Sequence, residues 1–322
     1  SREEMEEVGR LRTIEEWTKT AEDMMKAGTL FVLLTGGEPL LYPHFRELYQ
    51  KLRELGMIIT INTNGTLIDE AWADFFAENK PRRINITLYG ASNETYERLC
   101  HYPGGFDKAV NGIRLLRERN IDVKVNGSLA KANVDDRMKI IELGESLDAP
   151  VRIDTYMYPS VRERNHAYNN QARLDPEMAA KARVEILRRE MGEEVFAQYR
   201  KIRLDEAENT PEGEKVPGQM ACRAGKSSFV VNWQGEMRSC VVLDKPSIPL
   251  KDVEFEEAWE LTKKETESLR ISARCSSCKL RKVCNTCVAA AIAETGKADG
   301  VPEYLCRYTE ATVRYLKETM EE

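Results

Sequence analysis

Residues 30–39 read Leu30-Phe31-Val32-Leu33-Leu34-Thr35-Gly36-Gly37-Glu38-Pro39, an apolar run followed by a glycine-rich turn. A short apolar run that ends at a turn predicts a buried strand. Before it, Thr13 can cap an amphipathic helix that stops at Gly28. After it, Pro43 opens a helix that ends at Gly56. The stretch therefore predicts one strand between two helices, which is a unit of α/β architecture.

The same alternation continues to Pro159. Asp69 and Asn133 are expected to cap two further helices, and residues 106–119 form another. Five apolar strands, each preceded by a helix, predict a parallel sheet with helical crossovers. No Gly-x-Gly-x-x-Gly follows a strand, so a barrel or partial barrel is favoured, with its chemistry at the carboxyl ends of the strands. The strands expected after the first are Met57–Ile61, Ile84–Leu88, Ile121–Leu129 and Val151–Tyr156.

The composition indicates a folded enzyme. The chain has 322 residues, of which 42% are hydrophobic and 32% charged, so it can bury a core. Its 48 basic and 54 acidic residues are interspersed and give a net charge of −6, which disfavours nucleic-acid or anionic-membrane binding. The sequence has neither an apolar run near the roughly 18 to 20 residues of a membrane helix nor an N-terminal signal. We expect a cytoplasmic protein.

The character of the chain changes after Pro159. Asp175-Pro176 opens a charged helix that reaches about Arg203, and residues 205–218 look like a linker. Residues 229–242 are expected to form a small hairpin that turns at Gln234-Gly235. A closing helix is expected from Glu303 to Met320. We divide the chain into a barrel (1–160), a helical connector and linker (161–218) and a cysteine-rich α+β region (219–322).

Two polar segments follow neighbouring predicted strands. In Gly36-Gly37-Glu38-Pro39 the glycines let the backbone approach a ligand, and the Glu38 carboxylate suits an ammonium group. After the next strand, Thr63 and Asn64 supply donors and acceptors that suit a ribose or a carboxylate. The alternatives are an ordinary strand-to-helix turn and an Asx turn in which Gly65 takes a positive φ.

The cysteines are unevenly distributed. Seven of the eight lie between Cys222 and Cys306, four of them as Cys275-x2-Cys278-x5-Cys284-x2-Cys287. Thiolates at this spacing bind zinc or an iron–sulfur cluster, and seven do not divide into two complete four-thiolate sites. Cys100, beside His101 between a predicted strand and helix, is interpreted as a packing residue and not as a nucleophile.

This order of motifs resembles the radical S-adenosylmethionine (SAM) family with a C-terminal SPASM domain. Cys222, twelve residues, Gly235-x4-Cys240 and then the inner array match its pattern, except for two residues where the family usually has three before Cys287. The resemblance implies a partial (β/α) barrel followed by a small cysteine-rich α+β domain, with SAM as cofactor. The residues it assigns to SAM are Gly36, Gly37, Glu38, Pro39, Thr63 and Asn64.

The resemblance also implies two auxiliary [4Fe–4S] clusters. The nearer one would be bound by Cys222, Cys240 and Cys287, which leaves it one ligand short. That position is open to a substrate thiolate, or is filled by a missing segment or a side chain other than cysteine. The distal one would be bound by four residues, which are Cys275, Cys278, Cys284 and Cys306.

One defining feature of that family is absent from this sequence. Its Cys-x3-Cys-x2-Cys, which holds the SAM-cleaving cluster, and its first barrel strand do not occur here. We therefore expect a truncated chain that is inactive as written, and we assign function to its parent protein. No catalytic residue is assigned.

The implied activity is reductive SAM cleavage and hydrogen abstraction from a ribosomally made precursor peptide, with flavodoxin or ferredoxin as reductant. We expect a thioether cross-link. Val241 stands after Cys240 where sulfatase-maturing members have an Asp, which argues against that activity. The alternatives are another peptide oxidation or carbon–carbon cross-link, and a non-catalytic redox or binding module stapled by zinc or iron–sulfur sites.

Overall fold

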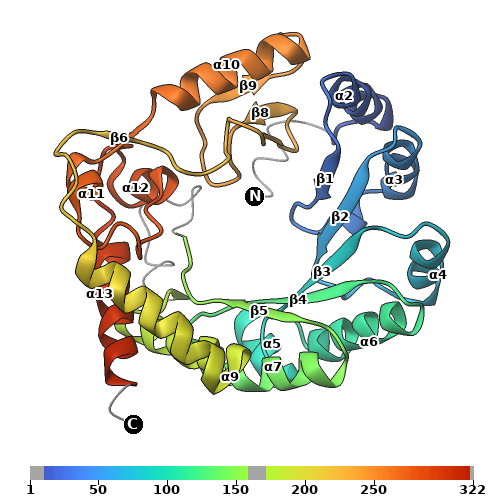
Figure 1. The fold of residues 1–322 in the computed structure, drawn as a ribbon. Helices are drawn as coiled ribbons and strands as arrows, with labels where there is room; N and C mark the ends of the chain where they lie inside the picture. The colour runs from blue at the N-terminus through green and yellow to red at the C-terminus, as the bar shows by residue number, and fades with distance from the viewer. Residues whose placement is uncertain (1–10, 159–171, 320–322) are drawn as a thin grey trace.

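The computed structural model describes residues 11–158 and 172–319. Five parallel strands form one sheet in the order β1-β2-β3-β4-β5, each preceded by a helix, as predicted (Figure 1). The strands are β1 (Phe31–Leu34), β2 (Ile58–Thr63), β3 (Arg83–Leu88), β4 (Val123–Ser128) and β5 (Val151–Asp154). The preceding helices are α2 (Ile14–Lys26), α3 (Phe45–Glu54), α4 (Glu70–Glu78), α6 (Gly105–Glu118) and α7 (Arg137–Ser146).

Local chemistry fixes the helix starts. The Thr13 side chain accepts a hydrogen bond from the backbone N–H of Glu16, whose carboxylate accepts one from Thr13 in return, so a capping box opens α2. Asp69 caps α4, as predicted. The expectation that Asn133 caps a helix is wrong. Its buried side chain instead bonds to the backbone of Tyr89, Ser128 and Ala130, and a 3-10 turn, η2 (Val134–Asp136), precedes α7.

A short helix, α5 (Asn93–Cys100), was not predicted. Ser92 caps it by accepting a hydrogen bond from the backbone N–H of Thr95 at 3.2 Å. Cys100 is therefore the last residue of a helix, and its expected place between strand and helix is wrong. The helix spans only eight residues, too few for helical periodicity to be distinctive.

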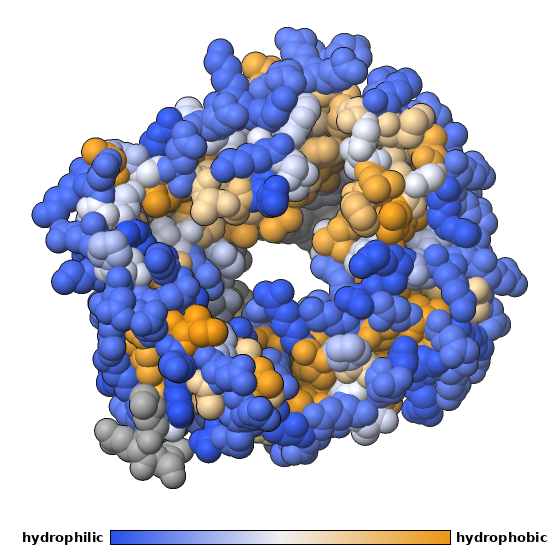
Figure 2. Space-filling model, in the orientation of Figure 1, coloured by the Kyte–Doolittle hydropathy of each residue, from blue (hydrophilic) through white to orange (hydrophobic). Residues whose placement is uncertain are grey.

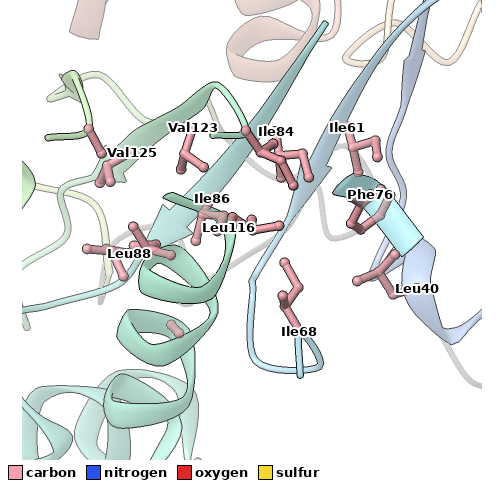
Figure 3. Close-up of a cluster of buried hydrophobic side chains, with 14 of the residues drawn as sticks. Leu40, Ile61, Ile68, Phe76, Ile84, Ile86, Leu88, Leu116, Val123 and Val125 are labelled. Carbon is pink, nitrogen blue, oxygen red and sulfur yellow. The ribbon is translucent and has the colours of Figure 1, made fainter. Parts of the chain in front are cut away.

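The sheet is buried on its helix-covered face only. Ile84, Ile86 and Leu88 point into that core, together with the alternate residues of the neighbouring strands (Figure 3). The intervening residues on β3 and β4, such as Asn85 and Asn126, are polar and half-exposed. The predicted burial of residues 30–34 is wrong, because β1 is an edge strand that pairs only with β2 among the described residues. Phe31 on β1 is 63% exposed.

A long helix leads from the sheet to the cysteine-rich region. Helix α9 (Pro176–Asn209) is interrupted at Gly192, which has φ 71° and ψ 165°. The helix extends six residues beyond the predicted end at Arg203, so the expected linker starts within it. Helix α13 (Glu303–Glu318) packs along α9, and Met320, its predicted end, lies outside the described residues.

Small elements make up the rest of this region. The predicted hairpin is present as β7 (Val230–Val231) and β8 (Glu236–Arg238), with a third strand, β9 (Ser247–Pro249), that was not predicted. A second pair joins β6 (Gly218–Gln219) to β10 (Arg270–Ile271). The remaining helices are η1 (Pro39–Leu41), α10 (Phe255–Ser268), α11 (Ala273–Ser277) and α12 (Val288–Thr295).

The elements form a ring around a central opening (Figures 1 and 2). The ring closes where the hairpin meets α2: Met24 of α2 packs on the cluster around Met237 and Phe255. The guanidinium of Arg12 lies against Gly235 at the hairpin turn. Among the described residues, no helix has the length and apolarity needed to cross a lipid bilayer.

Candidate functional site

The two polar segments after β1 and β2 meet at the carboxyl edge of the sheet. Glu38 connects them: its Oε1 accepts hydrogen bonds from Thr63 Oγ1 at 2.7 Å and from the Leu40 backbone at 3.1 Å. Its Oε2 accepts one from the Asn64 backbone at 2.8 Å. The parallel pairing of Leu34 with Ile61 brings the segments together. The carboxylate is therefore held rigidly beside both turns.

The turn at Gly65 requires glycine. Gly65 has φ +74°, and a Cβ there would lie 2.9 Å from Cγ2 of Ile86 on the next strand. Helix α6 approaches equally closely, because a Cβ on Gly112 would lie 2.6 Å from the Gly65 carbonyl oxygen. Asn64 Oδ1 also accepts from the backbone and hydroxyl of Thr66, which is the Asx turn considered as the alternative. The Asx turn uses the Asn64 side chain, and this does not prevent Thr63 and Asn64 from also forming part of a ligand site.

Tyr89, which follows β3, lies at the same edge and was not singled out from the sequence. Burial, then the charges of Cys100 and Glu38, raise the pKa of its phenol. The Cys100 thiol is half-buried, and burial raises its pKa too, which fits a packing residue better than a nucleophile.

Four cysteines line one cavity of about 70 Å³ between α11 and α13. They are the four assigned to the distal cluster, namely Cys275, Cys278, Cys284 and Cys306. Burial, then the negative charges of Glu303, Cys284 and Cys275, raise the pKa of the Cys306 thiol to about 12. Burial and the neighbouring cysteines likewise raise the pKa of Cys275. A bound cation would oppose both effects, because positive charge stabilises thiolates. The four thiols and the cavity that they share therefore fit a cluster of several metal ions better than a single ion.

The other cysteines lie apart from this cavity. Cys240 and Cys287 both lie close enough to Tyr158 for their charges to raise the pKa of its phenol. Burial is the largest cause of the raised pKa of Tyr158, followed by the charge of Cys287. Tyr158 follows β5, so these two cysteines approach the same edge of the sheet that carries Glu38. Cys222 is exposed.

A buried polar cluster joins the end of β5 to the cysteine-rich region. Arg173 Nη2 donates to Glu294 Oε1 at 3.0 Å, and both side chains are about nine-tenths buried. The Tyr156 hydroxyl donates to the same oxygen at 3.3 Å, and the Arg173 guanidinium lies 3.3 Å from the centre of the Tyr304 ring. Sequence reasoning missed this cluster, because its residues are separated by up to 148 positions and form no local motif.

None of the eight cysteines forms a disulfide. Within residues 11–158 and 172–319, no three His, Cys, Asp or Glu side chains stand close enough together to hold a single metal ion.

Comparison with known proteins identifies the class of the N-terminal region. Residues 1–144 match the radical SAM superfamily model. The chain thus carries a radical SAM domain with the α/β fold and parallel sheet of that superfamily of enzymes, as predicted. The superfamily implies SAM and a [4Fe–4S] cluster as cofactors.

Particular relatives extend over most of the chain. An AdoMet-dependent heme synthase of Methanosarcina barkeri (strain Fusaro / DSM 804) is 24% identical over 299 residues, covering 88% of this chain and 84% of that protein. A PqqA peptide cyclase of Rhodopseudomonas palustris (strain ATCC BAA-98 / CGA009) is 26% identical over 176 residues, covering 55% of this chain and 46% of the cyclase.

Solved structures show the shared fold. Native anSMEcpe with bound AdoMet and Kp18Cys peptide superposes with a TM-score of 0.68 at 19% identity, covering 96% of this chain and 90% of that chain. Streptococcus suis SuiB superposes with a TM-score of 0.67 at 16% identity, covering 92% and 71% respectively. The similarity to both structures covers the barrel and the cysteine-rich region together.

Proposed function

We propose that the protein is a cytoplasmic radical SAM enzyme that oxidises a ribosomally made peptide and joins a cysteine sulfur to a carbon atom. The proposal rests on one observation: Cys240 and Cys287 approach the carboxyl edge of the sheet that carries Glu38, Thr63 and Asn64. A sulfur site and a SAM site at one edge suit a reaction between a thiolate and a carbon.

Glu38 would bind the amino group of SAM. Its carboxylate is already oriented by three hydrogen bonds, so it needs little reorganisation to accept a hydrogen bond from an ammonium group. Gly36 and Gly37 carry no side chain that would shield it, and an added Cβ on either would have no atom within 4 Å. Pro39, Thr63 and Asn64 complete this set.

The cysteines are divided between two auxiliary [4Fe–4S] clusters. Cys275, Cys278, Cys284 and Cys306 would hold one completely, and their shared cavity supports this grouping. Cys222, Cys240 and Cys287 would hold the other and leave one position for a substrate thiolate. When bound, such a cluster supplies one-electron chemistry and a Lewis-acidic iron for that sulfur. The sequence contains no Cys-x3-Cys-x2-Cys, so no residue is assigned to the SAM-cleaving cluster.

The overall reaction replaces one C–H and one S–H bond of the peptide by a C–S bond. This two-electron oxidation is balanced by reductive cleavage of SAM to methionine and 5′-deoxyadenosine. The chain would divide into a barrel (1–160), a connector (161–218) and an auxiliary-cluster domain (219–322). A flavodoxin or ferredoxin would supply the electron for SAM cleavage. Names of the relatives support a peptide substrate: PqqA peptide cyclase, and anSMEcpe with its Kp18Cys peptide.

The test uses an Ala-Cys-Ala peptide as the thiol probe and Ala-Ser-Ala as its matched control. Anaerobically reconstituted protein is analysed for iron and sulfide, and the EPR signals of the reduced clusters are recorded with each peptide. We expect two clusters, one of which changes its signal with Ala-Cys-Ala only. Protein that holds only zinc contradicts the cluster assignment. Two clusters whose EPR signals do not change with Ala-Cys-Ala contradict the open iron position on the nearer cluster.

A second candidate is a tetrapyrrole substrate. The heme synthase of M. barkeri matches this chain over a longer stretch than the peptide cyclase, 299 residues against 176. Titration with iron coproporphyrin III separates the two candidates. A saturable shift of the porphyrin absorption band at micromolar protein would favour the tetrapyrrole, and no shift beside a thiol response favours the peptide.

A further inference from the structure

The inner face of the sheet turns away from the helices and toward the central opening (Figures 1 and 2). On β3 and β4 the buried Ile84, Ile86 and Val125 point into the core on the helix side (Figure 3). The residues between them, such as Asn85, point the other way, because successive side chains of a strand alternate between its faces. On β3, β4 and β5 every residue of this inner set is polar and at least half-exposed. The inner face therefore offers polar groups to a ligand in the opening.

The strand register arranges these polar side chains in rows. Asn85 of β3 is level with Asn62 of β2 on one side and with Lys124 of β4 on the other. Asn126 of β4 is level with Arg152 of β5. Neighbouring strands lie about 4.8 Å apart, so the members of a row can contact one ligand together. Each row therefore ends in a basic side chain that stands beside an amide.

The amides of these rows suit a peptide. Asn85 Nδ2 donates a hydrogen bond to Asn62 Oδ1 at 2.7 Å, which leaves the second N–H of Asn85 and the amide N–H groups of Asn62 for a ligand. An amide side chain both donates and accepts hydrogen bonds, as a peptide group does. The row therefore matches the hydrogen-bonding groups of an extended peptide.

The basic side chains of the inner face differ in their partners. Arg83 forms an ion pair with Asp122 at 2.8 Å, and Arg152 forms one with Asp154 at 3.1 Å. Among residues 11–158 and 172–319, no carboxylate lies within ion-pair distance of the Lys124 ammonium group. Lys124 is therefore the uncompensated positive charge of this face.

Two charges of α9 also lie near this group. Burial raises the pKa of Glu190, and the positive charges of Arg183, then Arg152 and then Lys124 oppose that effect. Since Arg183 has the largest of these charge effects, Glu190 is compensated mainly by Arg183. Glu190 therefore does not neutralise Lys124.

We propose that Lys124, with Arg152 on the next strand, binds a carboxylate of the substrate, so that the enzyme selects peptides with Asp or Glu on one side of their cysteine. An ammonium group forms charge-assisted hydrogen bonds with a carboxylate, which are stronger than those between neutral groups. The ion pair of Arg152 with Asp154 is exposed and therefore weak, so Arg152 is available to the same carboxylate.

The position of Lys124 along β4 sets the spacing in the substrate. Lys124 stands four residues before Ser128, the last residue of β4. At about 3.3 Å per residue, it lies about 13 Å from the edge of the sheet that carries Glu38. An extended peptide covers this distance in about four residues. The inference rests on the proposed function for its peptide substrate and for the reacting cysteine at that edge.

The experiment titrates the full chain, reconstituted anaerobically, with two peptides that are blocked at both ends. The probe is acetyl-Glu-Ala-Ala-Ala-Cys-Ala-amide, and the matched control has Gln in place of Glu. We expect the Glu peptide to bind about tenfold more tightly at low salt, because a charged hydrogen bond is gained. The difference should shrink as salt screens the charges.

Charge reversal on the protein tests the assignment to Lys124. Lys124→Glu should abolish the preference for the Glu peptide. Lys264→Glu, the same change at an exposed lysine of α10, should retain it. Equal affinities of the two peptides for the unsubstituted protein overturn the proposal, and so does a preference that survives Lys124→Glu.

The outcomes separate this inference from the proposed function. Two clusters that respond to Ala-Cys-Ala, with equal binding of the two blocked peptides, overturn the carboxylate site alone. Protein that holds zinc alone contradicts the proposed function, while the comparison of Glu and Gln peptides still tests Lys124. Iron coproporphyrin III, which has carboxylates of its own, is the third ligand. If it binds through Lys124 and neither peptide binds, the carboxylate belongs to a tetrapyrrole and the proposal is overturned.

Discussion

The barrel and the cysteine-rich region are stabilised in different ways. The barrel has one continuous core, in which Ile61, Ile84, Ile86 and Leu116 are completely buried. The hairpin part of the cysteine-rich region has a core of three buried residues, Met237, Phe255 and Ala258. Apolar burial stabilises in proportion to the area removed from water, so the barrel gains far more from it.

Cysteines are concentrated in the second region. Seven cysteines lie there, and four of them line a cavity. Small regions with a small apolar core are commonly stabilised by bound metals or disulfides. None of these cysteines forms a disulfide. Replacing a large side chain by alanine should therefore lower stability through lost apolar burial in the barrel. In the cysteine-rich region, replacing a cysteine should lower stability through the loss of a metal ligand.

The largest effect is expected from Cys278→Ala. Thiolate binding of metal can contribute about 10 kcal/mol or more to folding, which is comparable to the whole free energy of unfolding of a domain. We expect insoluble protein or loss of one cluster's iron, with the region after residue 218 becoming sensitive to protease. Iron analysis and limited proteolysis check this.

Cys100→Ser is the matched control, because Cys100 belongs to neither ligand set and lies at the end of α5. Its iron content should equal that of the unsubstituted protein. A soluble Cys278→Ala protein with unchanged iron content would show that Cys278 is not a ligand. It would also contradict stabilisation of the cysteine-rich region by metal binding at this residue.

A smaller effect is expected from Phe76→Ala in the barrel. Phe76 is completely buried among the rings of Phe45, Tyr49 and Trp72. Deleting such a ring typically costs about 3–5 kcal/mol. Phe31→Ala on the exposed edge strand should change stability by about 0.5 kcal/mol or less. Urea unfolding of both variants measures the difference, and equal losses would contradict the one-sided burial of the sheet.

The smallest effect concerns pH. Burial raises the pKa of Glu236, but hydrogen bonds from Ser247, Arg238 and Asn232 outweigh it and lower the pKa below its ordinary value of 4.5. A lowered pKa in the folded state stabilises above 4.5, and this contribution is lost as the pH falls through the folded value.

Glu236→Gln should therefore flatten the acid side of the stability profile of the hairpin. Melting temperatures between pH 3 and 7 measure it, with the exposed Glu256→Gln on α10 as control. Identical acid limbs in both variants would show that the hairpin is not held by this carboxylate.

The sequence predicted those elements whose signals are local. Thr13 and Asp69 each have a side chain that serves the next turn of backbone, so the two helix starts were correct. The same reasoning failed at Asn133, because its side chain bonds to the backbone of Ala130, Ser128 and Tyr89, which precede it, and not to the turn that follows it. The edge position of β1 could not be predicted from the sequence either. A short apolar run such as residues 31–34 does not show how many neighbouring strands pair with it.

The candidate site divides in the same way. Gly36–Pro39 and Thr63–Asn64 could be found because each follows a strand directly, and parallel strands end at one edge. The pair of Arg173 and Glu294 could not, because only tertiary packing brings these two side chains together.

The contact that closes the ring also bears on the order of folding. Arg12 and Gly235 are 223 positions apart, whereas strands β1 to β5 each pair with the next strand along the chain. Contacts between distant segments require a long loop to be closed, so they form late and add little until both ends are in place. The seam between α2 and the hairpin is thus a late step in folding.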